Sequence, residues 1–400
     1  DLATGAELGA AGGGSAARGA VLAGTSDWGS GTCVARTVGA LMAQESPQVT
    51  VHLGDVYWVG TPAQFDINVA GKPPNDKQVG VAFPKGSHST MLTLGNHEAI
   101  SGCEGIFKNG FSYSGQMASY AVYQSDSWRI LVLDSGYLSY TFLPGPRRYR
   151  NIALTSDAPQ PEQVERWLQE TVRLGDPEDK RGIVIMTHHQ VYSDWESVYL
   201  GTAKQLNKLI PPNRTVVWFF GHEHRLALYS KMRVKDAESD FVTDFSIHPR
   251  MVGNGGFPDN VGPPKRYDKL IAWDNRVFQA IPRFPLPAKD ISFNGFFKLT
   301  ITDAEMQVDY ITTKCVDSGC EQGLNQTAGT TMATETYTVD KKSGAVTHAV
   351  SYLSDGLSRP PASREVFSEG DGGGDVAQCI PRNPNLAHDP HTMVQETSMD

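Results

Sequence analysis

Short apolar segments that each lead to a potential metal ligand constrain this chain more than any other feature. They occur at residues 20–24, 48–53, 91–94, 183–186 and 216–220, and each has the length of a buried strand. The polar residues that follow them are Asp27, Asp55, Asn96, His188, His222 and His224. Because the loops after parallel strands open at one edge of a sheet, we expect these six side chains to converge there.

The stretches between these segments indicate helices packed on a mostly parallel sheet. Residues 35–44 have helical spacing and separate the first two predicted strands, which makes a strand–helix–strand unit. Residues 161–174 predict a further helix, with Pro161 at its first position and Gly175 after its end. The segments 60–88, 138–160 and 232–292 show little periodicity, and we expect irregular structure there. The fold class is therefore α/β.

The pattern changes after about residue 290. Residues 295–311 alternate on both sides of a turn at 302–304 and predict a β-hairpin, and residues 336–352 predict a second one that turns at 342–344. Residues 1–19 are rich in Gly, Ala and Ser and read as a flexible lead-in. We expect a lead-in at 1–19, a main domain at 20–315, and a C-terminal extension at 316–400 that has an irregular tail.

The residues at the strand ends favour a particular chemistry. Carboxylate, amide and imidazole groups together suit Mn, Fe, Zn or a similar metal. A carboxylate that bridges two such metals holds them close together, and the pair can clamp an in-line displacement at phosphorus.

The motifs that carry these residues are S-D-W-G, G-D-V-Y-W, G-N-H-E, H-H and G-H-E-H. In this order, each after an apolar strand, they resemble those of the calcineurin-like metallophosphoesterases. The first motif is similar to that of purple acid phosphatases and of a bacterial branch with the string GDVYY. The similarity runs from about Ala20 to about Thr313 and includes the glycine-rich loop at 253–256. It implies a four-layer α/β/β/α sandwich and metal-dependent hydrolysis of a phosphate monoester or diester.

The resemblance also implies a role for each residue. Asp55 would bridge two divalent or trivalent ions, with Mn, Fe or Zn preferred. The other ligands would be Asn96, His188 and His222 for the second metal, and Asp27 and His224 for the first. His97 would lie beside the phosphate, neutralise developing charge and protonate the leaving oxygen, while a metal-bound hydroxide attacks phosphorus.

The sequence departs from the family pattern at the first metal. Many members have D-x-H in the first motif, where this chain has Gly29. Purple acid phosphatases supply a tyrosine as G-D-x-x-Y, where this chain has Trp58, and indole cannot ligate. Tyr57 is adjacent, but alternation along an extended segment would point it away. We therefore expect a weaker first site and no tyrosinate-to-iron colour.

Other residues near the motifs allow two interpretations each. His189 either contacts substrate or is a spare loop histidine, and His188 is preferred as the ligand because it comes first after the apolar run. Arg225 binds a phosphate oxygen or, as is more usual, pairs with a structural carboxylate. Asn254 lines the pocket or adopts a left-handed turn. Asp134 orients a ligand histidine or caps a loop.

Two other functions compete with phosphoester hydrolysis of a small substrate. The chain could be an inert module that binds a phosphorylated ligand or a protein, because both usual extra ligands of the first metal are missing. The seven retained site residues weigh against this, since a folded non-enzyme does not need them all. A nuclease is disfavoured because the net charge is −9 and no basic-aromatic stripe is present.

Composition sets the remaining limits. Apolar residues make up 40% of the chain and charged residues 20%, as in ordinary globular proteins. No apolar run reaches about 18 residues, so we expect no membrane span. Of the 5 cysteines, Cys315 and Cys320 are spaced so that they either form a bridge or stay as thiols. The odd count and the lack of a recognisable leader favour a cytoplasmic setting, and the sequence leaves the oligomeric state open.

Overall fold

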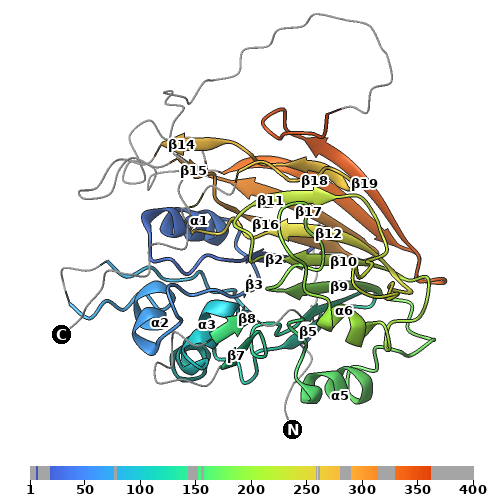
Figure 1. Cartoon of the computed structure of the whole chain (residues 1–400), viewed down its shortest axis with the longest axis horizontal. Helices are drawn as coiled ribbons and strands as arrows, with labels where there is room; N and C mark the ends of the chain where they lie inside the picture. Colours follow the sequence, from blue (N-terminus) through green and yellow to red (C-terminus); the bar gives the residue numbers. More distant parts are fainter. Residues whose placement is uncertain are drawn as a thin grey trace, which may run out of the picture.

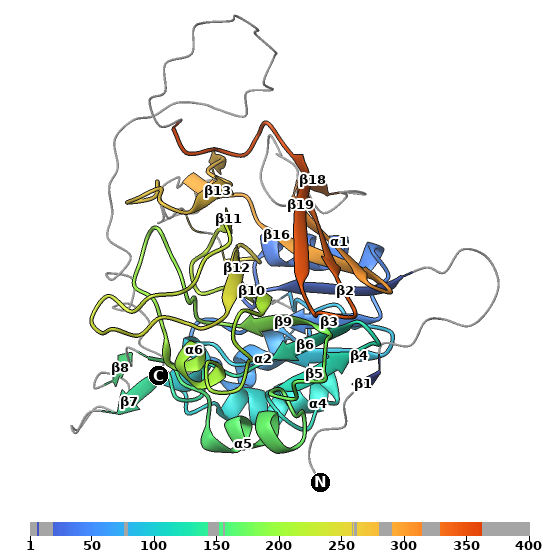
Figure 2. The same ribbon diagram turned by 90° about the vertical axis from the view of Figure 1, so that its right-hand side faces the viewer.

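Two large β-sheets lie face to face at the centre of the molecule, with helices on their outer sides (Figure 1 and Figure 2). The computed structural model describes residues 6–7, 19–75, 79–142, 152–154, 157–257, 259, 262–279, 290–313 and 329–361. The expected α/β class and the α/β/β/α order of layers are confirmed.

The first sheet has seven strands, and the order across it departs from the order in the chain. It runs β19 (Val346–Leu353), β18 (Thr330–Val339), β17 (Glu305–Thr312), β16 (Gly295–Thr302), β2 (Ala20–Thr25), β3 (Val49–His52) and β4 (Ser89–Leu92). Strands β2, β3 and β4 are parallel, and the remaining pairs are antiparallel. Both predicted hairpins are confirmed as β16–β17 and β18–β19. The second hairpin extends the same sheet as β2, and the domain boundary at residue 315 stays a prediction.

The second sheet has eight strands. It runs β1 (Ala6–Glu7), β5 (Ala121–Gln124), β6 (Trp128–Val132), β9 (Gly182–Thr187), β10 (Thr215–Phe220), β12 (Ser246–Val252), β11 (Leu226–Tyr229) and β13 (Leu270–Trp273). Strands β6, β9, β10 and β12 form its parallel centre. Two small pairs complete the strands, β7 (Tyr140–Phe142) with β8 (Ile152–Leu154) and β14 (Val277–Gln279) with β15 (Asp290–Ser292).

Apolar burial holds the layers together. Between the sheets, Phe219 of β10 stacks on Phe297 of β16 with ring centroids 4.6 Å apart. Helices α5 (Glu162–Glu170) and α6 (Gly201–Leu206) pack on the outer face of the eight-stranded sheet through residues such as Trp167 and Leu206. Helix α1 (Cys33–Gln44) covers the outer face of the seven-stranded sheet. The predicted helices at 35–44 and 161–174 are thus confirmed, although α5 ends at Glu170.

The segment 60–88, which we expected to be a loop, contains helix α2 (Pro62–Asn68). Thr61 and Gln64 form a capping box at its start, and Pro62 takes the first helical position. Among its apolar residues only Phe65 is buried, and the Gly, Pro and Lys around the helix hid its capping signals in the sequence. Three short helical elements follow: α3 (Asn96–Ile100), the π-helical turn η1 (Ile106–Gly110) and α4 (Phe111–Ser114).

The segments 138–160 and 232–292 also differ from the expectation of irregular structure. The first contains β7 and β8, and the second contains β12 to β15. Strand β12 was not predicted from the sequence because His248, Pro249 and Arg250 interrupt its apolar pattern. Arg250 is nevertheless fully buried, because its guanidinium pairs with Glu335 of β18 at 2.6 Å across the sandwich.

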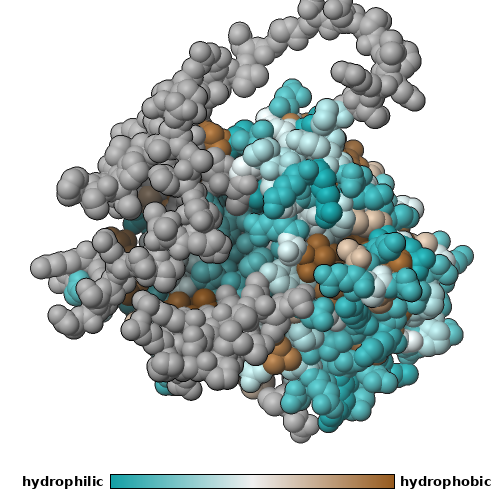
Figure 3. Space-filling model, in the orientation of Figure 1, coloured by the Kyte–Doolittle hydropathy of each residue, from teal (hydrophilic) through white to brown (hydrophobic). Residues whose placement is uncertain are grey.

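The surface seen in Figure 3 is mainly hydrophilic over the described residues, with separate hydrophobic spots. Within the described part of the chain, no helix combines the length and the apolar character needed to cross a membrane.

Candidate metal centre

The six predicted ligands all lie just beyond the carboxyl ends of parallel strands in the two facing sheets. The first three follow strands of the seven-stranded sheet, and the others follow strands of the eight-stranded sheet. They are Asp27 after β2, Asp55 after β3, Asn96 after β4, His188 after β9, and His222 and His224 after β10. The sandwich therefore brings the two sets together at one edge, as the sequence predicted.

Sharp backbone turns place several of these side chains. Asp27, Asp55 and His222 have positive φ angles of 58°, 70° and 69°, in the left-handed region that non-glycine residues seldom adopt. Such residues cluster at functional sites because the surrounding structure holds them there. Loop 253–256 packs directly against this turn region, since a Cβ on Gly255 would lie 2.0 Å from the Ser26 carbonyl oxygen.

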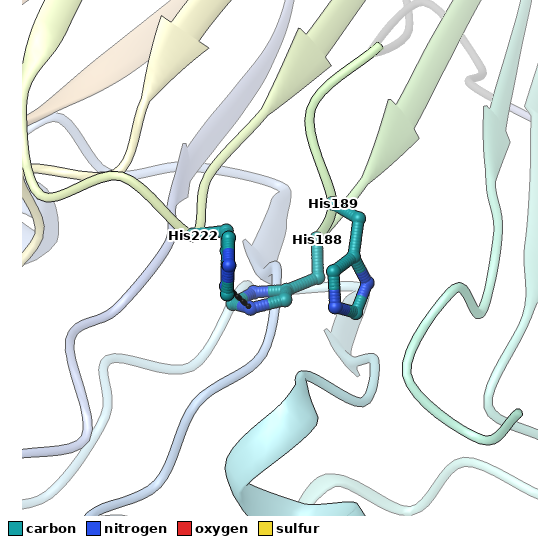
Figure 4. A group of neighbouring side chains, drawn as sticks. All are labelled: His188, His189 and His222. Atoms are coloured by element: carbon teal, nitrogen blue, oxygen red, sulfur yellow. Dashed lines mark hydrogen bonds between the residues drawn. The ribbon is translucent and has the colours of Figure 1, made fainter. Parts of the chain in front are cut away.

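The candidate ligand atoms of the second metal, called the second group below, centre on His188. Its Nε2 lies 2.9 Å from Asn96 Oδ1, 3.2 Å from His222 Nδ1 and 3.4 Å from Asp55 Oδ1. Figure 4 shows the rings of His188 and His222 meeting, and the centroid of the His189 ring lies 4.8 Å from that of His188 and 5.0 Å from that of His222. His188 Nδ1 lies 2.9 Å from the Leu53 carbonyl, which can only accept, so Nδ1 carries a proton and Nε2 is the ring atom turned toward the other three atoms. This arrangement fits a cation.

The candidate ligand atoms of the first metal, called the first group below, centre on the hydroxyl of Tyr57. This hydroxyl lies 3.1 Å from Asp27 Oδ1, 3.3 Å from Asp55 Oδ2 and 2.9 Å from His224 Nε2. A single hydroxyl proton cannot serve both carboxylates at once, so this set of ligand atoms also fits a cation. The two oxygens of Asp55 face different groups, Oδ1 toward His188 and Oδ2 toward Tyr57.

The prediction that the Tyr57 side chain points away from the site was wrong. Tyr57, Trp58 and Val59 form a turn, so the alternation of an extended strand does not apply to them. Tyr57 is buried in the site, and Trp58 is 56% exposed outside it. The first group therefore has a fourth candidate ligand beside Asp27, Asp55 and His224, and the premise for expecting no tyrosinate colour fails.

The electrostatics of the first group favour positive charge. Burial alone would raise the pKa of Asp27, but the hydrogen bond from His224 and the charges of His188 and His224 bring it well below its ordinary value. Burial would lower the pKa of His224, but hydrogen bonds and charges from Asp259 and Asp27 raise it to about 10. Asp259 Oδ2 lies 3.5 Å from His224 Nδ1 and leaves Nε2 facing the site. No sequence signal marked Asp259, which lies in an irregular loop.

Glu98 ties the second and third motifs together. Its carboxylate accepts the backbone N–H groups of Gly95, Asp55 and Val56 at 2.8, 3.1 and 2.7 Å. Burial and the nearby charge of Asp55 raise the pKa of Glu98 to about 8. Glu98 is the last residue of the G-N-H-E motif, but its place in the sequence did not indicate this role.

His97 lies at the open side of the centre. Its backbone N–H donates to Asp55 Oδ1 at 3.0 Å, and its Nδ1 lies 2.5 Å from the Trp58 carbonyl oxygen, which fixes the ring. The imidazole is 25% exposed, and its Nε2 lies 3.7 Å from Asp55 Oδ2. This position is compatible with the predicted contact to substrate, and the catalytic role stays a prediction.

The structure decides most of the open alternatives around the site. Arg225 is buried with its Nε 3.4 Å from Glu223 Oε2, so the preferred pairing with a structural carboxylate is confirmed. Asp134 caps a loop by accepting the N–H groups of Gly136 and Tyr137. The buried Asn254 side chain donates to the Phe293 carbonyl at 3.5 Å.

His189 is buried rather than exposed to substrate. Its Nδ1 lies 3.1 Å from Ser135 Oγ, and its ring belongs to a cluster with His188 and His222 that could hold a metal. Asp55 and Asn96 approach His188, so the geometry favours His188 as the ligand. Cys315 and Cys320 lie outside the described residues.

Comparison with known proteins identifies the family. A model of the calcineurin-like phosphoesterases matches residues 22–226, which is more than half of the chain. The chain therefore belongs to the calcineurin-like phosphoesterase family. This family uses metal ions to hydrolyse phosphoesters, and the Asp and His clusters described above offer candidate ligands.

Solved structures show a more distant likeness. The structure of PhoD has 13% identity and a TM-score of 0.46, over 87% of this chain and 74% of that one. GAP50, the anchor in the inner membrane complex of Plasmodium, has 13% identity and a TM-score of 0.44, over 74% of this chain and 85% of that one. Among curated proteins, none matches this sequence significantly.

Proposed function

We propose that the chain hydrolyses small phosphate esters at a dinuclear metal centre that Asp55 bridges. The observation that carries this proposal is the division of the Asp55 carboxylate, with Oδ1 3.4 Å from His188 Nε2 and Oδ2 3.3 Å from the Tyr57 hydroxyl. Each oxygen thus belongs to a separate group of ligand atoms. When bound, Mn, Fe or Zn ions would supply a hydroxide nucleophile and neutralise charge at phosphorus.

The protein residues hold this centre in shape. Asn96, His188 and His222 would hold the second metal, and Asp27, Tyr57 and His224 would hold the first. The Leu53 carbonyl and Asp259 each orient one imidazole through its Nδ1, so that Nε2 faces the centre. Glu98 fixes the backbone on which Asp55 and Asn96 are held.

His97 would act on the leaving oxygen. Its Nδ1 is directed at the Trp58 carbonyl, so Nε2 is the ring atom available to the substrate. A protonated Nε2 would neutralise charge on the phosphate and donate the proton to the leaving group.

Replacement of the bridging residue tests the proposal. We expect Asp55→Ala and Asn96→Ala to abolish turnover of phosphate esters, because each removes a ligand atom from the second group. Metal content by elemental analysis should fall from about two ions per chain, and circular dichroism should show the fold retained. Asp126→Ala, an exposed aspartate in the turn between β5 and β6, is the control and should keep both metals. Full activity of Asp55→Ala would contradict the dinuclear mechanism.

An inert module with an incomplete first metal site is the second candidate. Gly29 at the place of a family histidine supports it. The Tyr57 hydroxyl weighs against it, because it restores a ligand atom to the first group. Wild-type protein that holds one metal or none after reloading with Mn, Fe or Zn would favour the inert module.

A further inference from the structure

Trp58 stands at the outer side of the candidate centre, three residues after Asp55. Its side chain is 56% exposed, while the neighbouring Tyr57 is buried. Its carbonyl oxygen contacts His97 Nδ1 at 2.5 Å, so the Trp58 backbone is fixed to the residue that would protonate the leaving group. Single exposed apolar side chains are common on protein surfaces. Trp58 differs from them because it lies beside the candidate metal centre and its carbonyl contacts His97.

A row of aromatic rings leads from the centre to Trp58. Phe257 packs on His224 and Tyr57, with ring centroids 4.6 and 4.3 Å apart. The Trp58 indole meets Phe257 edge to face, with centroids 5.3 Å apart, and lies 5.9 Å from the Tyr57 ring. The contacts hold the indole beside the first group of ligand atoms and leave 56% of the side chain exposed.

We propose that Trp58, supported by Phe257, binds the leaving group of the substrate, and that the preferred substrates are phosphate esters whose leaving group carries an aromatic ring. This inference rests on the proposed function. A phosphate at the centre has its leaving oxygen beside His97, and the leaving group then extends over the residue whose carbonyl holds His97. Tryptophan offers a large flat surface on which another ring can stack, whereas an aliphatic alcohol gains less from it.

The aromatic ring can come from two sources. In an aryl phosphate the ring is joined directly to the ester oxygen, and in a nucleoside monophosphate a sugar separates the two. Phenyl phosphate and adenosine monophosphate are therefore the two aromatic probes, and glycerol phosphate is the aliphatic reference.

The experiment compares kcat/KM for the three esters in metal-loaded wild type, Trp58→Ala and Trp58→Phe. We expect the ratio of phenyl phosphate to glycerol phosphate to fall by about fivefold to tenfold in Trp58→Ala and to recover largely in Trp58→Phe. Each ratio is compared with its wild-type value, so the intrinsic reactivity of the ester cancels. Tyr352→Ala, which removes an exposed aromatic ring from β19 at the far edge of the seven-stranded sheet, should leave the ratio unchanged.

Calorimetric binding of phenylphosphonate and methylphosphonate, which are not hydrolysed, separates failure of this inference from failure of the proposed function. If wild type hydrolyses none of the esters, the proposed function is refuted. If it nevertheless binds phenylphosphonate more tightly than methylphosphonate, and Trp58→Ala abolishes this preference, Trp58 is still a ring-binding residue. A selective loss with adenosine monophosphate alone would support the inference and assign the ring to a nucleoside. Equal changes for all three esters, or none, would overturn the inference.

Discussion

The hydroxyl of Tyr57 is the residue-scale feature that the sequence did not predict. In purple acid phosphatases the tyrosine of the G-D-x-x-Y motif stands at the position of Trp58. Alternation of side chains along an extended strand predicted that the neighbouring Tyr57 points away from the metal site. The turn at residues 57–59 reverses this outcome and brings the hydroxyl to within 3.3 Å of two carboxylates and an imidazole. The six other candidate ligands were predictable because each follows an apolar strand, and the two facing sheets bring these strand ends to one edge of the sandwich.

Replacement of Tyr57 tests whether this hydroxyl ligates. We expect iron-loaded wild type to show a visible charge-transfer band, because a phenolate bound to ferric iron donates electron density to it. Tyr57→Phe should lose the band and part of the metal at the first site, as followed by absorption spectroscopy and elemental analysis. Tyr352→Phe, which alters an exposed tyrosine on β19, should keep the band. A band that survives in Tyr57→Phe would exclude Tyr57 as its source.

His97 should contribute to turnover without holding metal. Its ring is fixed by the Trp58 carbonyl and lies outside both groups of ligand atoms. We expect His97→Ala to lower kcat by roughly a hundredfold or more, which is typical for loss of a general acid. Elemental analysis of the same preparation should still find the wild-type metal content. Loss of metal would instead place His97 in the coordination shell.

At the scale of secondary-structure elements, buried polar groups mark the limit of prediction from sequence. Apolar strands and the amphipathic helix α5 were found from their periodicity. Strand β12 was missed because Arg250 reads as a surface residue until its partner Glu335, 85 positions away, is known. Helix α2 was missed because capping rather than an apolar stripe defines it.

Glu98 fixes α3 to the loop after β3, and its removal should loosen both. Glu98→Ala leaves three buried backbone N–H groups without their acceptor, so we expect a loss of at least about 2 kcal/mol in the free energy of unfolding. Urea denaturation of the metal-free protein measures this directly. Glu104→Ala is the matched control, because the Glu104–Lys108 pair is exposed and should contribute under about 1 kcal/mol. Equal stability of the two variants would contradict the role of Glu98.

At the scale of the whole molecule, the pair of Arg250 and Glu335 joins the two sheets inside the sandwich. Tyr310 and Tyr337 donate to the same carboxylate at 2.8 and 3.2 Å, and His348 Nε2 lies 2.8 Å from it. Burial alone would raise the pKa of Glu335, but Arg250 and His348 lower it from 4.5 to about 2. The ionised carboxylate therefore stabilises the fold above about pH 4.5, and this stabilisation is lost as the pH falls toward about 2.

The acid stability of the molecule should follow this pair. We expect the free energy of unfolding of wild type to fall by about 3 kcal/mol between these pH values through Glu335 alone. Glu335→Gln should be less stable near neutral pH, since it leaves a buried guanidinium unpaired, and its stability should depend less on acid pH. Chemical denaturation across the pH series measures both. An acid dependence identical to that of wild type would show that other carboxylates are responsible.

The compartment is a property of the whole chain that stays a prediction. Cys33, at the start of α1, is disulfide-bonded, whereas Cys103 is a buried free thiol. Disulfides are rare in reducing compartments, and the cytoplasmic setting stays a prediction that these two cysteines do not test.

The position of β2 has a consequence for when the centre can form during synthesis. Every candidate ligand has been translated once residue 224 is made, yet β2, which leads to Asp27, gains its second neighbour only from β16. Until residues 295–302 arrive, β2 is an apolar edge strand, open to pairing with other nascent chains. Closure over such a sequence distance is slow. The ligands are thus translated early, and the scaffold that aligns them is completed late, so a ribosome stalled before β16 would carry all of the ligand side chains but not an assembled centre.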